Sequence, residues 1–335
     1  MQLDDERYKY IRLSRPGFWM RRLLRRPTLD RALYADSNIS AEDQAALADV
    51  VRSSQRRFQD RRLLFIFGMM PRSGTNFLFE LLLRVPPFQR SQIGFAELPI
   101  LAGEDYFRGP TDLIGRVHRP SADAFGRMEW MAYAVSGFRN RVLDIASPGS
   151  VTLIKNPVTW NIELWPVFFP QDRTLFIVRD SRYVVDSFVR TFARRRLSRT
   201  FEDICIETAL AVEKSLAFIA SQPEERLLLL RYEDVVADKA GSVSKVLSWM
   251  GCDPQRCPAE ALEDVAVYGS STHSRRHASG RVDWTPVTPD ATFDPVNRSL
   301  DWPLSWRRVF DRHCGLLNER LGYPGTDRYS VNSGS

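Results

Sequence analysis

The sequence predicts one α/β domain with a mostly parallel central sheet and helices on both faces. Four apolar runs of strand length are each followed by a turn and by helical apolar spacing, an alternation typical of α/β folds. The length of 335 residues allows one large domain of this kind or two small ones, and a hydrophobic content of 44% is normal for a globular core. The strand-like runs begin at residues 63, 151, 173 and 226.

Composition narrows the choice of partners. The net charge of +6 favours anionic ligands, such as a nucleotide or an anionic acceptor. Aromatic and basic residues do not alternate, so we expect no nucleic-acid partner. No apolar run is long enough to span a bilayer, and the acidic N-terminus lacks a signal region, so we expect a cytoplasmic protein. The four cysteines lack metal-ligand spacing; Cys252 and Cys257 could pair, but reduced thiols suit this compartment better.

The chain is expected to comprise an N-terminal helical extension at 1–60, a main domain at 61–325 and a C-terminal tail at 326–335. Within the extension, residues 18–27 mix large apolar side chains with four arginines, which would suit peripheral contact with an anionic membrane. A helix packed on its own domain with a solvated basic face is the favoured interpretation of so short a segment. Ser40, followed by two acids, is typical of an N-cap and predicts a helix to about Phe58.

The first apolar run leads into a turn that we predict to bind an anion. Gly68, Pro71 and Gly74 shape the turn, and helical spacing begins at Phe77. A strand, a tight turn and a helix start place free backbone N–H groups and the positive end of a helix dipole at one point. That point attracts phosphate or sulfate.

This turn is P-loop-like, but its cation lies inside the loop. Arg72 supplies the positive charge, with the hydroxyls of Ser73 and Thr75 beside it. The nucleoside-triphosphate loop needs a second glycine followed by lysine, whereas here Ser73 stands at that glycine position and no lysine follows. An ordinary turn with an exposed arginine is the other interpretation, but the coincidence of turn, cation and hydroxyls favours an anion site.

Two further residues are candidates for chemistry. Glu97 stands alone among apolar residues and could act as a general base or be an exposed loop acid; Glu104 and Asp105 are the alternatives. Lys155 ends the second apolar run, and a lysine at the carboxyl end of a parallel strand either points into the ligand crevice or merely caps the strand. Pro157 is expected to start the next helix.

The third and fourth runs end in residues suited to a nucleotide. Arg179 closes the third run, and Ser187 follows eight residues later with helical spacing between them. Arginine suits a terminal phosphate because its fork gives bidentate hydrogen bonds, although a surface pair with Asp180 is the alternative. Tyr232 is expected at the tip of the fourth strand, where its ring could contact a base or pack against the next helix.

The remaining stretches predict helices and one long loop. Helical spacing indicates a helix from about Phe201 to Ser221 and another that ends at Gly251. Residues 268–300, rich in Gly, Ser, Pro and Arg, are expected to form a loop. An apolar stripe across 304–321 predicts a terminal helix that packs on the core.

Taken together, these motifs resemble those of sulfotransferases. Pro-Arg-Ser-Gly-Thr at 71–75 resembles the 5′-phosphosulfate loop of that family, and Lys-Asn-Pro at 155–157 resembles an element of its tyrosylprotein and glycan branches. Arg179 and Ser187 match the family's 3′-phosphate motif. Arg-Tyr-Glu-Asp after the fourth run and Leu-Gly-Tyr at 321–323 are typical of these enzymes.

The resemblance implies transfer of a sulfuryl group from 3′-phosphoadenosine 5′-phosphosulfate (PAPS), without a metal, to a hydroxyl of a glycan, a lipid-linked sugar, tyrosine or a secondary metabolite. It implies that Glu97 removes the acceptor proton, and that Lys155 and Arg72 stabilise the transferring group. The nucleotide-binding residues that it implies are Arg72, Ser73, Gly74, Thr75, Asn76, Arg179, Ser187, Tyr232 and, in the late loop, Ser279 and Gly280.

Two departures qualify the resemblance. Pro157 stands where the cytosolic phenol branch has a catalytic histidine, which favours the tyrosylprotein and carbohydrate type. The tryptophan and asparagine expected in the late loop are out of register, which leaves the nucleotide contacts of 270–285 open. A P-loop nucleotide kinase and a non-catalytic nucleotide-binding protein are the alternative functions. The absence of Gly-Lys-Thr and of a strand ending in a metal-binding acid argues against the kinase.

Overall fold

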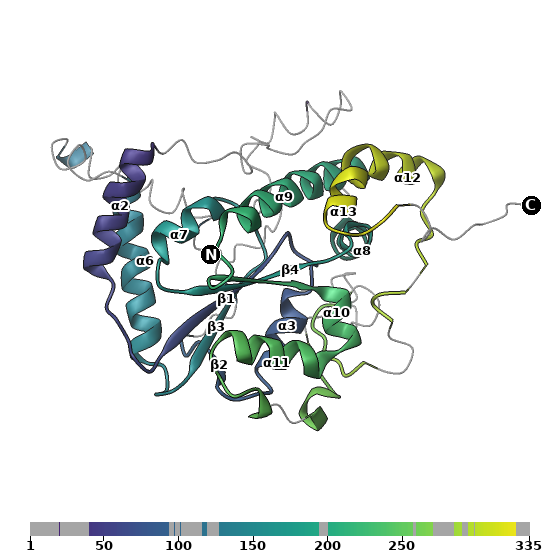
Figure 1. Ribbon diagram of the computed structural model, residues 1–335. Coiled ribbons are helices and arrows are strands. Elements are labelled where there is room, and N and C mark those ends of the chain that lie inside the picture. Colours follow the sequence, from purple (N-terminus) through teal and green to yellow (C-terminus); the bar gives the residue numbers. More distant parts are fainter. Residues whose placement is uncertain are drawn as a thin grey trace, which may run out of the picture.

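The predicted α/β architecture is confirmed. Figure 1 shows a central sheet with helices on both of its faces. This computed structural model describes residues 20, 40–93, 97, 101, 116–118, 127–193, 200–256, 259–270, 285–289, 294–297 and 299–325.

The described strands form one five-stranded, all-parallel sheet in the order β2-β3-β1-β4-β5. The central strand β1 pairs with β3 on one side and with β4 on the other. Because the strands are parallel, their carboxyl ends meet at one edge, and the loops that follow β1, β3 and β4 converge there. The strand bounds are β1 Arg62–Gly68, β2 Phe88–Arg90, β3 Val151–Asn156, β4 Arg173–Val178 and β5 Leu227–Arg231.

Each face of β1 packs into its own apolar core. Phe65 and Phe67 belong to a core that also contains residues of α2, α6, α7, α8, α9 and α12. Leu64 and Ile66 point the other way, into a core with α3, α10 and α11. Burial on both faces is what a continuous apolar run in a parallel strand requires. The helix bounds are α2 Ala41–Ser54, α3 Thr75–Leu82, α6 Arg127–Asp144, α7 Trp165–Phe168, α8 Ser181–Phe188, α9 Phe201–Ser221, α10 Tyr232–Ala237, α11 Lys239–Trp249, α12 Leu304–Phe310 and α13 Leu316–Arg320.

The expected helix start at Pro157 is wrong. Residues 157–159 have no regular structure, and the next element is the 3₁₀ helix η3 at Ile162–Leu164. The side chain of Asn156 accepts a hydrogen bond from the backbone N–H of Val158 at 3.3 Å. Such a local side-chain bond competes with helical hydrogen bonding and delays the helix.

Several boundaries also differ from those expected. The helix after Ser40 ends at Ser54, short of Phe58. Tyr232 begins α10 and does not lie in the strand, because β5 ends at Arg231. β5 is an edge strand and is only partly buried, which leaves Leu229 exposed. By contrast, the helix predicted at 201–221 is confirmed as α9, which begins with a capping box at Thr200.

The last helical stretch is continuous but not uniformly α-helical. A π-helical turn, η7 at Asp311–Gly315, separates α12 from α13. At the other end of the chain, α2 packs on α6 and α7, with Leu47 and Val51 in the main core. The division at residues 60 and 325 stays a prediction, and residues 18–27 lie outside the described residues except for Met20. No helix within the described ranges combines the length and apolarity needed to cross a bilayer.

Candidate functional site

The turn between β1 and α3 has an unusual backbone. Arg72 and Gly74 have φ angles of 84° and 103°. A Cβ at Gly74 would lie 2.3 Å from Cδ2 of Tyr232, so glycine is required by both conformation and space. A non-glycine residue with positive φ is uncommon and is often found at functional sites. The Ser73 hydroxyl is buried within the turn, where it donates to the Met70 carbonyl at 2.7 Å and so fixes the shape of the turn.

Arg179 lies directly after β4 with its charge surrounded by neutral groups. It is 7% exposed, and its two terminal nitrogens donate to the carbonyl oxygens of Arg72, at 3.1 Å, and Pro295, at 2.8 Å. Its guanidinium carbon is 4.2 Å from the centroid of the Tyr232 ring. Nε has no hydrogen-bond partner, and Arg179 forms no ion pair with a carboxylate of the described chain. A buried cation without a counter-ion is costly, so this environment favours an anion.

Arg72 joins the turn to α8 and to the late part of the chain. Its Nε donates to the Ser187 hydroxyl at 3.0 Å, and Nη2 donates to the Gly269 carbonyl at 2.8 Å. The Arg179 guanidinium contacts the backbone carbonyl of the same Arg72, so the turn is joined both to the end of β4 and to α8. Arginine and hydroxyl side chains gathered in this way could bind a phosphate through charge-assisted hydrogen bonds.

A second polar cluster surrounds Lys155. Its Nζ lies 3.5 Å from Oε2 of Glu97 and also donates a hydrogen bond to the side-chain oxygen of Asn76, at the start of α3. Glu97 forms a parallel β-bridge with Lys155, which places the acid beside the end of β3. The side chain of Lys155 is 12% exposed and that of Glu97 is 36% exposed. Burial lowers the pKa of Lys155, while the Glu97 carboxylate opposes that change.

The structure thus places most of the candidate residues in two adjoining clusters. The first cluster contains Arg72, Gly74, Arg179, Ser187 and Tyr232, and the second contains Asn76, Glu97 and Lys155. They meet at the turn before α3, where Ser73 and Thr75 are buried. Glu104, Asp105, Ser279 and Gly280 lie outside the described residues.

Sequence reasoning missed the carbonyl oxygens of Gly269 and Pro295. Both accept hydrogen bonds from site arginines, so the two ends of the late loop approach the turn. Every residue has a backbone carbonyl, so the residue type does not reveal which one will accept a hydrogen bond. The only signal in the sequence was the Gly- and Pro-rich composition of 268–300, which predicts a loop.

The described side chains of the site do not form a metal centre. No cluster of three or more His, Cys, Asp or Glu residues that could hold a metal ion occurs in the part of the chain that the structure describes. Cys205, Cys252 and Cys314 are free thiols, whereas Cys257 lies outside the described residues. The cationic groups of the site are the side chains of Arg72, Lys155 and Arg179.

The structure is that of an α/β protein with a parallel sheet, a P-loop-like turn and arginines at the carboxyl edge of the sheet. The family model described as the sulfotransferase family matches residues 64–255, which contain both clusters. The chain therefore belongs to the sulfotransferase family, as its motifs predicted. The alternative of a P-loop nucleotide kinase is not favoured by this match.

Similarity to a solved sulfotransferase domain supports the fold assignment. The sulfotransferase domain from the curacin biosynthetic pathway is 17% identical, with a TM-score of 0.50, and the match covers 80% of this chain and 100% of that domain. The sulfotransferase domain of the Synechococcus PCC 7002 olefin synthase is 14% identical over 81% of this chain and 98% of that one, with a TM-score of 0.47. A mouse sulfotransferase complexed with PAP is 16% identical over 85% and 95%, with a TM-score of 0.44. No curated protein sequence matched the chain.

Proposed function

We propose that this protein transfers a sulfuryl group from PAPS to a hydroxyl. The observation that carries the proposal is the environment of Arg179: a buried guanidinium whose Nε is unpaired and whose partners are neutral among the described residues, near Arg72 and Ser187. A terminal phosphate would supply the missing counter-charge, and the 3′-phosphate of PAPS is the group that these motifs bind in the family. Tyr232, stacked against Arg179, is suited to contact the adenine.

The reaction would be an in-line displacement at sulfur. A bond forms between the acceptor oxygen and sulfur while the bond from sulfur to the phosphate oxygen breaks, which releases 3′-phosphoadenosine 5′-phosphate (PAP). Charge develops on the sulfuryl oxygens and on the leaving phosphate, in parallel with phosphoryl transfer. In this proposal the backbone N–H groups of the turn, Arg72 and Lys155 would stabilise that charge.

The acceptor proton would pass to Glu97. Its carboxylate is partly exposed and lies beside Lys155, so one group that accepts a proton and one that stabilises charge stand next to each other. No histidine follows Lys155, since Pro157 occupies that position. This constellation supports a glycan, a lipid-linked sugar, tyrosine or a secondary metabolite as acceptor, in preference to a small phenol.

Calorimetric binding of PAP, 5′-AMP and ATP without magnesium tests the donor assignment. We expect PAP to bind at least about tenfold more tightly than either competitor, because only PAP carries a 3′-phosphate for Arg179. Arg179→Ala should abolish the preference and leave 5′-AMP binding unchanged. Equal or tighter binding of ATP, or binding of none of the three, would overturn the proposal.

A further inference from the structure

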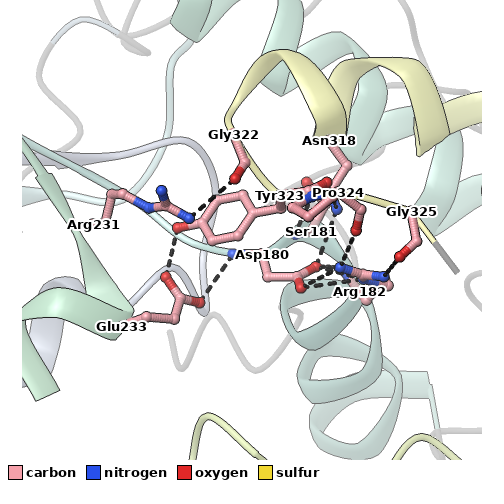
Figure 2. Close-up of polar contacts among 10 residues, drawn as sticks. All are labelled: Asp180, Ser181, Arg182, Arg231, Glu233, Asn318, Gly322, Tyr323, Pro324 and Gly325. Atoms are coloured by element: carbon pink, nitrogen blue, oxygen red, sulfur yellow. Dashed lines mark hydrogen bonds and ion pairs between the residues drawn. The ribbon is translucent and has the colours of Figure 1, made fainter. Parts of the chain in front are cut away.

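The C-terminal segment Asn318–Gly325, here called the C-terminal latch, contacts the residues that flank the two nucleotide candidates Arg179 and Tyr232. Figure 2 shows these contacts, in which residues of the latch approach the starts of α8 and α10. The partners of the latch are Asp180, Ser181, Arg182, Arg231 and Glu233. The latch thus contacts the residues next to Arg179 and Tyr232 in the chain.

Glu233 is the central link. One carboxylate oxygen accepts a hydrogen bond from the Tyr323 hydroxyl at 2.5 Å, and the other accepts from the backbone N–H of Asp180 at 3.2 Å. Tyr323 is 2% exposed, and the guanidinium of Arg231 lies 4.3 Å from the centroid of its ring. The residue after Tyr232 is therefore tied directly to the residue after Arg179, and Tyr323 secures that tie.

Asn318 makes a second link at the start of α8. Its side-chain oxygen accepts from the backbone N–H of Ser181 at 2.8 Å, and its side-chain nitrogen donates to the Asp180 carboxylate at 3.2 Å. That carboxylate also pairs with Arg182, which in turn donates to the carbonyl oxygens of Pro324 and Gly325. Fully buried ion pairs of this kind are stabilising only when their hydrogen bonds are satisfied, and here the latch completes them.

These contacts occupy the backbone donors at the start of α8. The N–H groups of Asp180, Ser181 and Arg182 are bonded to Glu233, Asn318 and the Asp180 carboxylate, respectively. A helix start normally offers such groups to an anion. Here all three already have side-chain acceptors, one of them Asn318 of the latch, so binding of a phosphate beside α8 depends on side chains, above all that of Arg179.

The side chain of Arg179 donates to two carbonyl oxygens and lies over the Tyr232 ring. These contacts can form only when the Arg179 backbone is correctly placed. Its position is consequently set by the main chain, which β4 fixes on one side and the Glu233 and Asn318 contacts fix on the other. Groups that bind a ligand need this kind of support from a surrounding shell.

We propose that the C-terminal latch positions Arg179 for the 3′-phosphate of the donor, with Tyr323 and Glu233 as its positioning residues. The inference rests on the proposed function. It assigns a role in donor selection to Tyr323, which is 90 residues from Glu233 in the sequence, and to Asn318, which is 138 residues from Asp180. Burial, followed by the charge of Glu233, raises the pKa of Tyr323, so its hydroxyl stays a donor across the physiological pH range.

Tyr323→Phe tests the latch, because it removes the hydroxyl and keeps the ring on Arg231. We expect the Kd for PAP to rise about tenfold, which corresponds to the loss of one hydrogen bond to a charged group. The Kd for 5′-AMP, which lacks the 3′-phosphate, should change less than about twofold. Glu233→Ala should have a similar effect, since it removes both acceptor oxygens.

Ser150→Ala is the matched control. It removes one buried hydroxyl bond, from Ser150 to the Ser147 carbonyl at 2.6 Å, at the amino end of β3. It should lower the melting temperature without changing the ratio of the two affinities. If Tyr323→Phe behaves like this control, or weakens PAP and 5′-AMP alike, the latch is only structural and the inference fails.

A double-mutant cycle separates this inference from the proposed function. In an Arg179→Ala background, Tyr323→Phe should cause no further loss of PAP affinity, because the latch acts through Arg179. Additive losses would overturn the latch and leave the donor site intact. If Arg179→Ala alone leaves the preference for PAP over 5′-AMP unchanged, the proposed donor site fails, and the latch inference fails with it.

Discussion

Two arginines near opposite ends of β4 are both almost fully buried, yet their surroundings differ. Arg139, from α6, forms two hydrogen bonds with the carboxylate of Asp172, at 2.6 and 3.0 Å, directly before the strand. Arg179, directly after the strand, has carbonyl oxygens and the Tyr232 ring as partners and an unpaired Nε. The exposed fractions, 4% and 7%, are nearly the same.

The comparison shows that burial alone does not distinguish an arginine that is neutralised within the protein from one that is suited to bind an anion. At the amino end of the sheet the charge of Arg139 is neutralised within the protein, and a bidentate pair of this kind holds α6 to the sheet. At the carboxyl end the charge of Arg179 has no carboxylate partner among the described residues, so a bound anion would neutralise it. A buried arginine therefore indicates function through its partners and not through its depth.

The comparison predicts that chemistry is confined to the carboxyl edge. We expect Lys155→Ala and Glu97→Gln each to lower turnover by about 10²–10⁴-fold, since each removes a group that acts on charge or a proton in the transition state. Ser150→Ala, at the opposite edge, should leave turnover within about twofold of wild type. The measurement is transfer of radiolabelled sulfuryl from PAPS to an acceptor found by screening.

Near wild-type turnover in either Lys155→Ala or Glu97→Gln would remove that residue from the mechanism. If only Glu97→Gln were active, Glu104→Gln and Asp105→Asn would be the next variants to measure.

Exchanging the two arginines for neutral residues should separate stability from binding. Arg139→Ala leaves the buried Asp172 carboxylate unpaired and should lower the free energy of unfolding by about 3–5 kcal/mol. Arg179→Ala removes a charge without a carboxylate partner and should change that free energy by less than about 1 kcal/mol, while PAP affinity falls. Urea unfolding and calorimetry measure the two quantities.

The opposite results would contradict the assignment of a structural role to Arg139 and a binding role to Arg179. A large loss of stability in Arg179→Ala would mean that its carbonyl contacts are mainly structural, and unchanged stability in Arg139→Ala would mean that Asp172 finds another partner, such as the neighbouring Arg226.

The sequence predicted the strands and the residues at their ends well, because both depend on local signals. A short apolar run such as 175–178 indicates a strand buried on both faces, and the polar residue after such a strand is expected at the carboxyl edge. The fold class and the approach of Arg72 to Ser187 follow from this logic. The helix start at Pro157 failed because the side chain of Asn156 competes for the backbone N–H of Val158.

The contacts that support the site were not predictable in the same way. Tyr323 was visible only as the end of a Leu-Gly-Tyr sequence after an apolar stripe, and nothing local shows that its hydroxyl meets Glu233. The short strand β2 and the helix α6 also carry weak patterns, because tertiary packing outweighs propensity in such segments. Long-range polar pairs require the fold itself.

The smallest expected effect concerns the charge of Lys155. Burial lowers its pKa and Glu97 raises it, so Glu97→Gln should lower the pKa of Lys155 further. A lysine whose pKa is lowered in the folded state destabilises that state while charged, and the cost disappears as pH rises through the folded pKa toward the unfolded value. NMR titration of ¹³C-labelled lysine, with Lys155→Ala to assign the signal, measures the shift. Glu80→Gln, which removes a smaller contribution, should lower the pKa less; an equal or larger effect would show that Glu97 is not the main partner of Lys155.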